Sequence, residues 1–358
     1  MNKLDIVKSY YQSWVKEDIE SLAQILYTPK FGIRNYFKDL LFSIEDIKTE
    51  FKKYKITSFL ISNFKENDNV CYCDIVFEYI YKDTPLEVNV SAKIIFENNK
   101  IVRVYELLYN PKYTRVKCIV SYDGSVFSGF QRQLKERTVQ GDIEKGLKYL
   151  TKEDITIHSS GRTDKGVHAL NQVFHFDTLS KIDPNDFWRV LRSYLPDTIY
   201  IKSSSKVPNT FHSRFDVASK EYMYVINYKE YDPIKRNYEW FVNDFDIDIF
   251  TSELNKIVGI HDFSSFTKTA EDREKIRKII EVKIEKTDSH LYVSIIGKGF
   301  LRYMVRYLIG TLIEIARGKT ELSIIDFINL KNPTLVEWKS PGGGLYLKEV
   351  IHYDWYYI

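Results

Sequence analysis

Cysteines and long apolar runs are scarce in this sequence, and each shortage excludes a class of protein. Three cysteines occur in 358 residues, an odd and sparse set that predicts no disulfide framework. Cys71 and Cys73 would share one face of a strand, but no second Cys/His pair accompanies them, so a zinc site is not expected. No segment is apolar enough to span a bilayer, and the charged, amphipathic N-terminus differs from a signal peptide. We therefore expect a protein of the reducing cytoplasm.

A strong excess of charge of one sign is also lacking. The formal net charge is only +3, so no basic field over the whole molecule indicates a polyanionic partner, and a nucleic-acid site must be a local patch. The length predicts two or three domains with enough apolar residues for real cores. The abundant Tyr and Phe residues suit base stacking as well as ordinary packing, and composition does not separate these two uses.

One short segment combines glycines, a carboxylate and several cationic side chains: Gly161–Arg162–Thr163–Asp164–Lys165–Gly166–Val167–His168–Ala169. Strand-like runs at 154–159 and 171–177 lie on either side of it. Glycines at both ends favour a turn, so the pattern predicts a hairpin loop that holds Asp164 between two strands. Arg162 could stabilise the ionised carboxylate. On local chemistry alone, an ordinary surface ion pair is the more common explanation of these residues.

The amino-acid sequence of this segment closely resembles the motif of the tRNA pseudouridine synthase A (TruA) family, in which the aspartate is the nucleophile. The resemblance extends from about residue 113 to 353, with several further motifs in the family's order. These are Ser121–Gly124, Gly129–Gln133, Thr138–Gln140, His212–Phe215 with Tyr222 and Tyr224, His261–Phe266, Met304–Arg306 and Gly343–Leu347.

The resemblance implies an active site built from three distant positions. It makes Asp164 the nucleophile, places Tyr222 against the target base and makes Arg306 the active-site arginine. A tyrosine ring can stack on uracil, and its hydroxyl can donate or accept a proton. A nearby cation such as Arg306 is expected to hold the pKa of Asp164 down against desolvation. Without the resemblance, a tyrosine on a sheet face is usually a core residue.

Four other residues are candidates for substrate contacts. Arg162 is expected to act as a wedge or a phosphate contact while the base leaves its stack. Gln131 and Arg132 lie in a polar segment that could contact RNA backbone or could simply be a braced loop. His168 could contact the backbone of the RNA or make a hydrogen bond within the hairpin.

The resemblance also implies the reaction and the partner. Conversion of uridine to pseudouridine breaks the N-glycosidic bond, rotates the base and rejoins it through carbon, so no redox cofactor or metal is required. A carboxylate can hold one fragment covalently, and attack at C1′ and attack at C6 both remain open. The family acts on the anticodon stem-loop of tRNA, at positions 38–40 just 3′ of the anticodon, and works as a homodimer.

Residues 1–110 lie outside this resemblance. Leu4, Val7 and Trp14 belong to a run of apolar residues at helical spacing, and further helices are expected at 18–26 and 43–54. Three or four strands are expected, at about 58–65, 70–81, 86–97 and 100–109. Helices followed by a long antiparallel sheet resemble the nuclear-transport-factor-2-like (SnoaL-like) superfamily, an α+β cone. Because that fold hosts enzymes, ligand binders and dimerisation modules, we expect an accessory domain.

Asn110–Pro111–Lys112 is the expected boundary, which gives a SnoaL-like domain at 1–110 and a synthase domain at 111–358. The second domain is expected to be α+β: an antiparallel-rich mixed sheet with helices, in two pseudo-repeated halves around a cleft. Asp183–Pro184 is expected to begin a helix that carries Arg189 and Arg192 on one face, either basic or merely solvated. A helix at 300–316 would place Arg302 and Arg306 one turn apart, and a strand at 345–353 would close the sheet.

Two other functions stay open on the sequence. One is an RNA-binding relative that folds tRNA without catalysis. The other is a small-ligand role for residues 1–110, which a deep apolar pocket with convergent polar groups would support.

Overall fold

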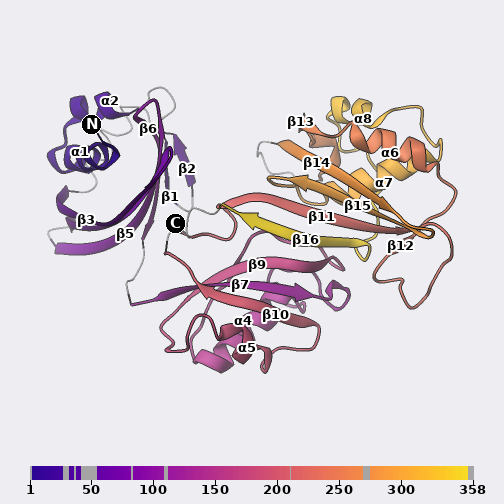
Figure 1. The fold of residues 1–358 in the computed structure, drawn as a ribbon, viewed down its shortest axis with the longest axis horizontal. Helices are drawn as coiled ribbons and strands as arrows, with labels where there is room; N and C mark the ends of the chain where they lie inside the picture. The colour runs from indigo at the N-terminus through magenta and orange to yellow at the C-terminus, as the bar shows by residue number, and fades with distance from the viewer. Residues whose placement is uncertain are drawn as a thin grey trace. The chain divides into compact units, whose positions relative to one another are not determined.

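The computed structural model describes residues 2–26, 32–35, 38–41, 55–81, 84–108, 112–209, 211–268 and 275–353. The chain divides into two compact units (Figure 1). Among the described residues, the first unit runs to Thr114 and includes the segment Pro208–Phe211, and the second comprises Arg115–Val207 and 212–353. Of the expected boundary residues, 110 and 111 lie outside the described residues.

The first unit packs two helices against one face of a six-stranded sheet. The helices are α1 (Lys3–Lys16) and α2 (Ile19–Ile25). The strands are β1 (Gly32–Asn35), β2 (Lys38–Leu41), β3 (Lys55–Asn67), β4 (Val70–Tyr81), β5 (Thr84–Glu97) and β6 (Lys100–Leu108), in the order β2-β1-β6-β5-β4-β3. The pair β1–β6 is parallel, and the other neighbouring strands of this sheet pair antiparallel.

The sequence pattern explains most of this unit. Asn2 and Asp18 cap the two helices through their side chains, as expected for residues that satisfy the first free N–H groups. Val7, Tyr10 and Tyr11 of α1 enter one buried cluster with Cys71 and Ile94 of the sheet. The predicted strands are present, and β1 and β2 are additional. The predicted helix at 43–54 lies outside the described residues.

The second unit contains a ten-stranded sheet with helices beside each of its two halves (Figure 1). The first half has β7 (Thr114–Tyr122), β8 (His158–Ser159), β9 (His168–Thr178) and β10 (Ile199–Lys206), with the 3-10 turn η1 (Gly124–Val126), α4 (Val139–Thr151) and α5 (Phe187–Arg192). The second half has β11 (Val217–Asn227), β12 (Trp240–Phe241), β13 (Gly259–Asp262), β14 (Ile276–Lys286) and β15 (His290–Gly297), with α6 (Ile247–Asn255), the turn η2 (Ser264–Phe266), α7 (Met304–Ala316) and α8 (Ile324–Leu330).

The predicted last strand, β16 (Leu345–His352), lies between β9 and β11 and so joins the two halves of the sheet. It runs parallel to β9, where Tyr346 faces His168, and antiparallel to β11, where Leu347 faces Tyr222. The sheet order is β10-β7-β9-β16-β11-β15-β14-β13, and most neighbouring strands pair antiparallel. A central position for β16 makes the C-terminal segment part of the core between the halves.

Three predicted elements begin elsewhere. The strand before Asp164 is limited to His158–Ser159. The helix expected from Asp183 begins at Phe187, because the Asp183 side chain accepts the N–H of Asn185 in a turn of its own. The helix expected from residue 300 begins at Met304, so Arg302 precedes α7 and does not share a helical face with Arg306.

Of the two arginines on the predicted basic face of α5, one packs against the sheet and the other is exposed. The Arg192 guanidinium lies 3.7 Å from the centre of the Tyr200 ring and donates to the carbonyl of Ile201 at 2.8 Å. Arg189 is exposed and lies 3.7 Å from Asp186. Arg192 therefore ties α5 to β10 and does not present its charge together with that of Arg189. In the part of the chain that the structure describes, no helix combines the length and apolar character needed to cross a membrane.

Candidate active site

The loop that carries Asp164 lies between β8 and β9 and is held by contacts from three other segments. The Lys220 Nζ on β11 donates to the carbonyl of Ser160 at 2.6 Å. The Thr163 hydroxyl lies 2.8 Å from the Tyr122 hydroxyl of β7, and the Thr163 carbonyl accepts the N–H of Phe130 at 3.1 Å. These bonds fix the backbone on both sides of the loop, as an active-site carboxylate requires.

Glycines act at this loop in two different ways. Gly166 has φ +77°, so the predicted turn at that end is confirmed. Gly161 does not have a positive φ, so no left-handed turn requires a glycine there, but a Cβ at 161 would lie 2.9 Å from the Lys220 Nζ that bonds to Ser160. Gly342 approaches from the loop before β16, where a Cβ would lie 2.5 Å from the carbonyl oxygen of Lys165. The lack of a side chain at 342 therefore lets the two loops pack backbone to backbone.

Arg306, in the first turn of α7, lies beside Asp164. Its Nη1 is 4.0 Å from the Asp164 Oδ2, and the two side chains are 12% and 20% exposed. The Nε of Arg306 donates to the carbonyl of Ser340 at 2.8 Å, and the Ser340 N–H donates back to the carbonyl of Arg306 at 3.1 Å. This pair of hydrogen bonds to one residue fixes the guanidinium toward the carboxylate.

Burial dominates the electrostatics of Asp164. Burial raises the pKa of this carboxyl, and the opposing charges of Arg306, Arg302 and Lys339 reduce the shift without cancelling it. Arg306 does lower the pKa of Asp164, as expected. The expectation that this would outweigh desolvation was wrong, because the pKa of the carboxyl is raised overall. A carboxylate with a raised pKa is a stronger base and a better nucleophile once ionised.

Tyr222 of β11 lies close enough to Asp164 for the carboxylate to affect its ionisation. Burial raises the pKa of the Tyr222 phenol, and the charges of Tyr122 and Asp164 raise it further. The phenol is therefore neutral at physiological pH, and its hydroxyl makes no hydrogen bond with any residue that the structure describes. Its ring meets Phe300 edge-on, with centroids 5.0 Å apart. Tyr224, on the same strand face, donates its hydroxyl to the Pro341 carbonyl at 2.7 Å and is a core residue.

The other predicted contact residues divide into exposed and buried ones. Arg162, Gln131 and Arg132 are exposed, and Arg162 has no hydrogen bond or ion pair with any described residue. Arg132 pairs with the buried Glu144 at 2.8 Å, so it braces its own loop. Its side chain remains 61% exposed.

The substrate-binding prediction for His168 was wrong. The ring is only 2% exposed and stacks on Tyr346 with centroids 4.8 Å apart. Its Nδ1 accepts the N–H of Gly124 at 3.0 Å, and its Nε2 lies 2.8 Å from the Asn237 carbonyl. Both ring nitrogens are used inside the fold, so His168 fixes η1 and β9 where they meet.

Two residues at this site were missed from the sequence. Lys220 was treated only as part of a strand, yet it reaches the Asp164 loop, and burial lowers its pKa to about 8. Lys339 is exposed and lowers the pKa of Asp164. No sequence pattern predicts where either side chain lies. The alternation along the strand predicts which face of the sheet Lys220 is on but not which residue it contacts, and Lys339 lies in a loop.

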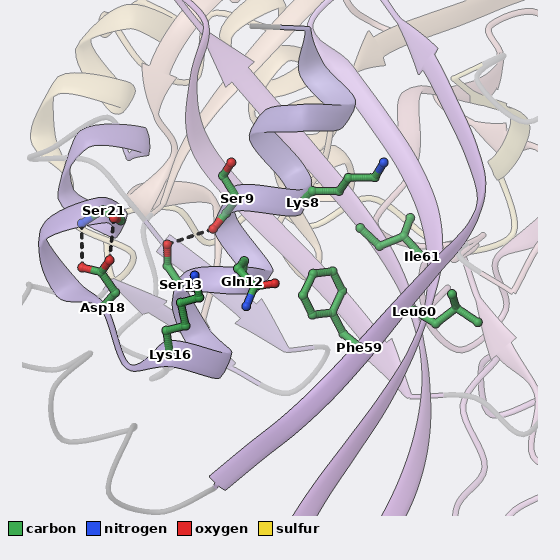
Figure 2. Close-up of a pocket in the computed structure, with 10 residues that line it drawn as sticks. All are labelled: Lys8, Ser9, Gln12, Ser13, Lys16, Asp18, Ser21, Phe59, Leu60 and Ile61. Carbon is green, nitrogen blue, oxygen red and sulfur yellow. Dashed lines mark hydrogen bonds between the residues drawn. The ribbon is translucent and has the colours of Figure 1, made fainter.

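The first unit has a groove between α1 and β3, of about 640 Å³ (Figure 2). Polar side chains, among them Lys8, Gln12 and Asp18, line one wall, and Phe59, Leu60 and Ile61 of β3 line the other. Leu60 is 67% exposed. Among the described residues, the space between α1 and the sheet is filled by the cluster that contains Tyr10, Tyr11 and Phe77, so the groove is an open surface feature and not a deep apolar pocket.

The second unit matches known proteins. A family model described as tRNA pseudouridine synthase matches residues 118–216 and 254–354. The chain is 38% identical over 243 residues to the tRNA pseudouridine synthase A of Anoxybacillus flavithermus, which covers 66% of this chain and 98% of that protein. It is 45% identical over 210 residues to the tRNA pseudouridine synthase A of Brevibacillus brevis, covering 57% of this chain and 85% of that protein.

Solved structures are similar at a much lower level. An LEH-like epoxide hydrolase of M. tuberculosis has 9% sequence identity and a TM-score of 0.28, covering 30% of this chain and 82% of that chain. A protein with a cystatin-like fold from Xanthomonas campestris has 16% identity and a TM-score of 0.26, covering 31% and 92%. At these TM-scores the likeness establishes neither a fold nor a function for this chain.

Proposed function

Because this chain belongs to the tRNA pseudouridine synthase A family and is an enzyme that isomerises uridine in tRNA, we propose that Asp164 is its nucleophile. The observation that carries the proposal is the distance of 4.0 Å between Asp164, on the loop between β8 and β9, and Arg306, on α7 beside the other half of the sheet. Tyr222 belongs to the same site, since the Asp164 charge raises the pKa of its phenol.

In this proposal Asp164 attacks as the carboxylate, at C1′ of the ribose or at C6 of the base. The N1–C1′ bond breaks, the uracil rotates while one fragment stays bound through the aspartate, and a bond from C5 to C1′ forms. C5 then loses its proton and N1 gains one, so the isomerisation leaves the composition of the nucleoside unchanged. The carboxylate is then released. The two sites of attack differ only in which fragment the enzyme holds.

Arg306 and Tyr222 prepare this step in different ways. Arg306 favours the ionised form of Asp164, and its bonds to Ser340 keep the guanidinium in place while charge moves. The neutral phenol of Tyr222 stacks against the target base and can hydrogen-bond one of its polar atoms, because that hydroxyl has no partner among the described residues. The base must leave its stack to reach either side chain.

The substrate we propose is the anticodon stem-loop of tRNA, with modification at positions 38–40. Arg162 and Gln131 are exposed on loops next to the site and serve as RNA contacts. Arg132 adds a third contact through the part of its side chain that stays exposed beside Glu144. Recognition then rests on shape and backbone and weakens steeply with salt. We further propose a cytoplasmic homodimer in which one RNA touches both subunits.

For the first unit we propose an accessory SnoaL-like domain at 1–110, beside a synthase domain at 111–358. The filled interior behind α1 supports a role in contact with partners over one in small-molecule catalysis.

Incubation of a tRNA transcript with the purified protein, followed by mapping of pseudouridine at each position, tests the proposed site of action. Product at one or more of positions 38–40 is expected. Tight binding without product would support the non-catalytic RNA-binding alternative, and product confined to another arm of the tRNA would contradict the anticodon assignment.

A further inference from the structure

Several cations converge on one tyrosine beside the active site. The Lys339 Nζ lies 4.7 Å, the Arg302 guanidinium 4.8 Å and the Arg306 guanidinium 5.8 Å from the centre of the Tyr303 ring. We call Arg302, Tyr303, Arg306 and Lys339 the Tyr303 cluster. A cation over an aromatic face is attracted by the negative face of the ring, so one ring can hold together like charges that would otherwise separate.

Tyr303 has an unusual backbone conformation for a residue with a Cβ. Its φ is +64°, in the left-handed region, and it stands directly before α7 without capping that helix through its side chain. A bulky residue in this region is strained, because its Cβ approaches the following carbonyl oxygen. The left-handed residue makes the helix begin at Met304, and this leaves Arg302 outside α7, next to the tyrosine ring and not on the helix surface.

Among the residues that the structure describes, the charges of the Tyr303 cluster are only partly balanced. Arg306 has the carboxylate of Asp164 at 4.0 Å. Within the described part of the chain, the one hydrogen bond of the Arg302 side chain goes to the Tyr303 hydroxyl, at 2.9 Å. Neither Arg302 nor Lys339 forms an ion pair with any residue that the structure describes, and both side chains are exposed. An anion from outside the protein would complete the cluster.

We propose that Arg302 and Lys339, held on the Tyr303 ring, bind a backbone phosphate of the RNA at one of the two linkages that flank the target uridine. The proposal rests on the proposed function. A nucleotide that leaves its stack to reach Asp164 brings its own flanking phosphates to the protein surface. Arg306 connects the cluster to the reacting carboxylate, because it lies 4.0 Å from Asp164 and its guanidinium lies 5.8 Å from the centre of the Tyr303 ring that also holds Arg302 and Lys339.

The same segment connects the phosphate contact to the active-site arginine. Lys339 directly precedes Ser340, which exchanges two hydrogen bonds with Arg306. Binding of the phosphate therefore fixes the loop that orients Arg306, and the RNA backbone contributes to the alignment of the site.

The first test compares Lys339→Gln and Arg302→Gln with the wild-type chain, with Lys319→Gln as a control. Lys319 is an exposed lysine just beyond the other end of α7 and has no side-chain partner among the described residues. We expect each cluster variant to weaken tRNA binding at least about fivefold and to reduce the slope of log K against log salt by roughly 0.7–0.9. Unchanged affinity and slope in both variants, or equal effects in the control, would overturn the proposal.

The second test uses full-length tRNA with one neutral methylphosphonate linkage, placed on the 5′ side or the 3′ side of the target uridine. If Lys339 contacts one of these phosphates, the loss caused by Lys339→Gln disappears on the RNA in which that linkage is neutral and persists on the other. A loss of the same size on both RNAs would show that these phosphates are not the ligand.

Tyr303→Asn tests the platform, since asparagine tolerates the left-handed region and removes the ring. It is expected to weaken binding like Lys339→Gln, and binding at the wild-type level would contradict the role of the ring. All three readouts are binding constants. They can be measured even if the wild-type chain forms no pseudouridine. That result would contradict the proposed nucleophile, whereas the binding constants would still test the phosphate contact.

Discussion

The Lys220 Nζ on β11 donates to the carbonyl of Ser160 at 2.6 Å. Lys220 is two residues before Tyr222, and Ser160 stands at the start of the Asp164 loop. One lysine thus links the strand that carries the tyrosine to the loop that carries the carboxylate. Burial, with the charge of Arg214 adding to it, lowers the pKa of Lys220 to about 8. A partly neutral amine keeps its N–H donors, so this bond does not require the full charge.

Lys220→Met is expected to lower the turnover number, because the loop loses a bond that sets the position of Asp164. A displacement of about 1 Å can cost up to about a hundredfold in rate, so we expect a loss of about ten- to a hundredfold with KM changed less than threefold. Lys220→Arg keeps a donor and should recover part of the rate. Equal losses in the methionine and arginine variants would contradict a positioning role.

Gly342→Ala is expected to displace the Asp164 loop, since a Cβ at 342 would lie 2.5 Å from the Lys165 carbonyl oxygen. Two rigid backbones meet there, so one must move, and the rate should fall at least about tenfold. Gly299→Ala is the matched control, because a Cβ at 299 has no neighbour within 4 Å. Steady-state kinetics of both variants are the measurement, and a wild-type rate for Gly342→Ala would show that the contact between the loops is dispensable.

Asp164→Asn is expected to raise the melting temperature at pH 7. The folded-state pKa of Asp164 is raised by burial, so its carboxyl favours the fold only in the protonated form. That contribution is complete below the unfolded pKa of about 3.9 and is lost as the pH rises through the folded pKa. The advantage of the asparagine should therefore shrink as the pH is lowered from 7 toward 4.

Asp123→Asn is the control for this stability effect. Burial opposes ionisation of Asp123, yet hydrogen bonds from Ser125 and Tyr238 lower the pKa of its carboxyl overall. Its replacement should lower the melting temperature at pH 7, opposite to Asp164→Asn. Thermal unfolding at several pH values checks both, and a lower melting temperature for Asp164→Asn at pH 7 would contradict the expected stabilisation.

Deletion of residues 1–110 is expected to leave tRNA pseudouridine formation at least partly intact. The matched motifs lie beyond residue 113, and the first unit has a core of its own. Pseudouridine formation by the soluble truncated chain is the measurement, with circular dichroism to verify its folding. A folded truncation without activity would show that the synthase needs the first unit.

Local patterns predicted the elements that depend on neighbouring residues. Thr138 caps α4 by accepting the N–H of Gly141, as its position before an amphipathic run indicated. The hairpin of β14 and β15 and the turn at Asn98–Asn99 also follow from spacing and turn chemistry. The three residues proposed for catalysis came from the resemblance to the family and not from any of these patterns.

The rest depended on contacts between distant segments. The central position of β16 is set by its pairing with β9 and β11, which strand periodicity does not encode. Arg302 left the predicted helix because Tyr303 is left-handed, and a tyrosine gives no sequence signal for that conformation. The burial of His168 and the raised pKa of Asp164 both arise from surrounding residues that lie far away in the chain.

The most direct test of the catalytic assignment is a single-turnover assay of Asp164→Asn on tRNA, run beside a binding assay at the same salt concentration. Asparagine has nearly the same size as aspartate but lacks the negatively charged oxygen that would attack the substrate. We predict no detectable pseudouridine with RNA binding within about threefold of the wild-type value, a difference of less than about 1 kcal/mol. Pseudouridine formation within a few-fold of the wild-type rate would contradict the assignment of Asp164 as the nucleophile.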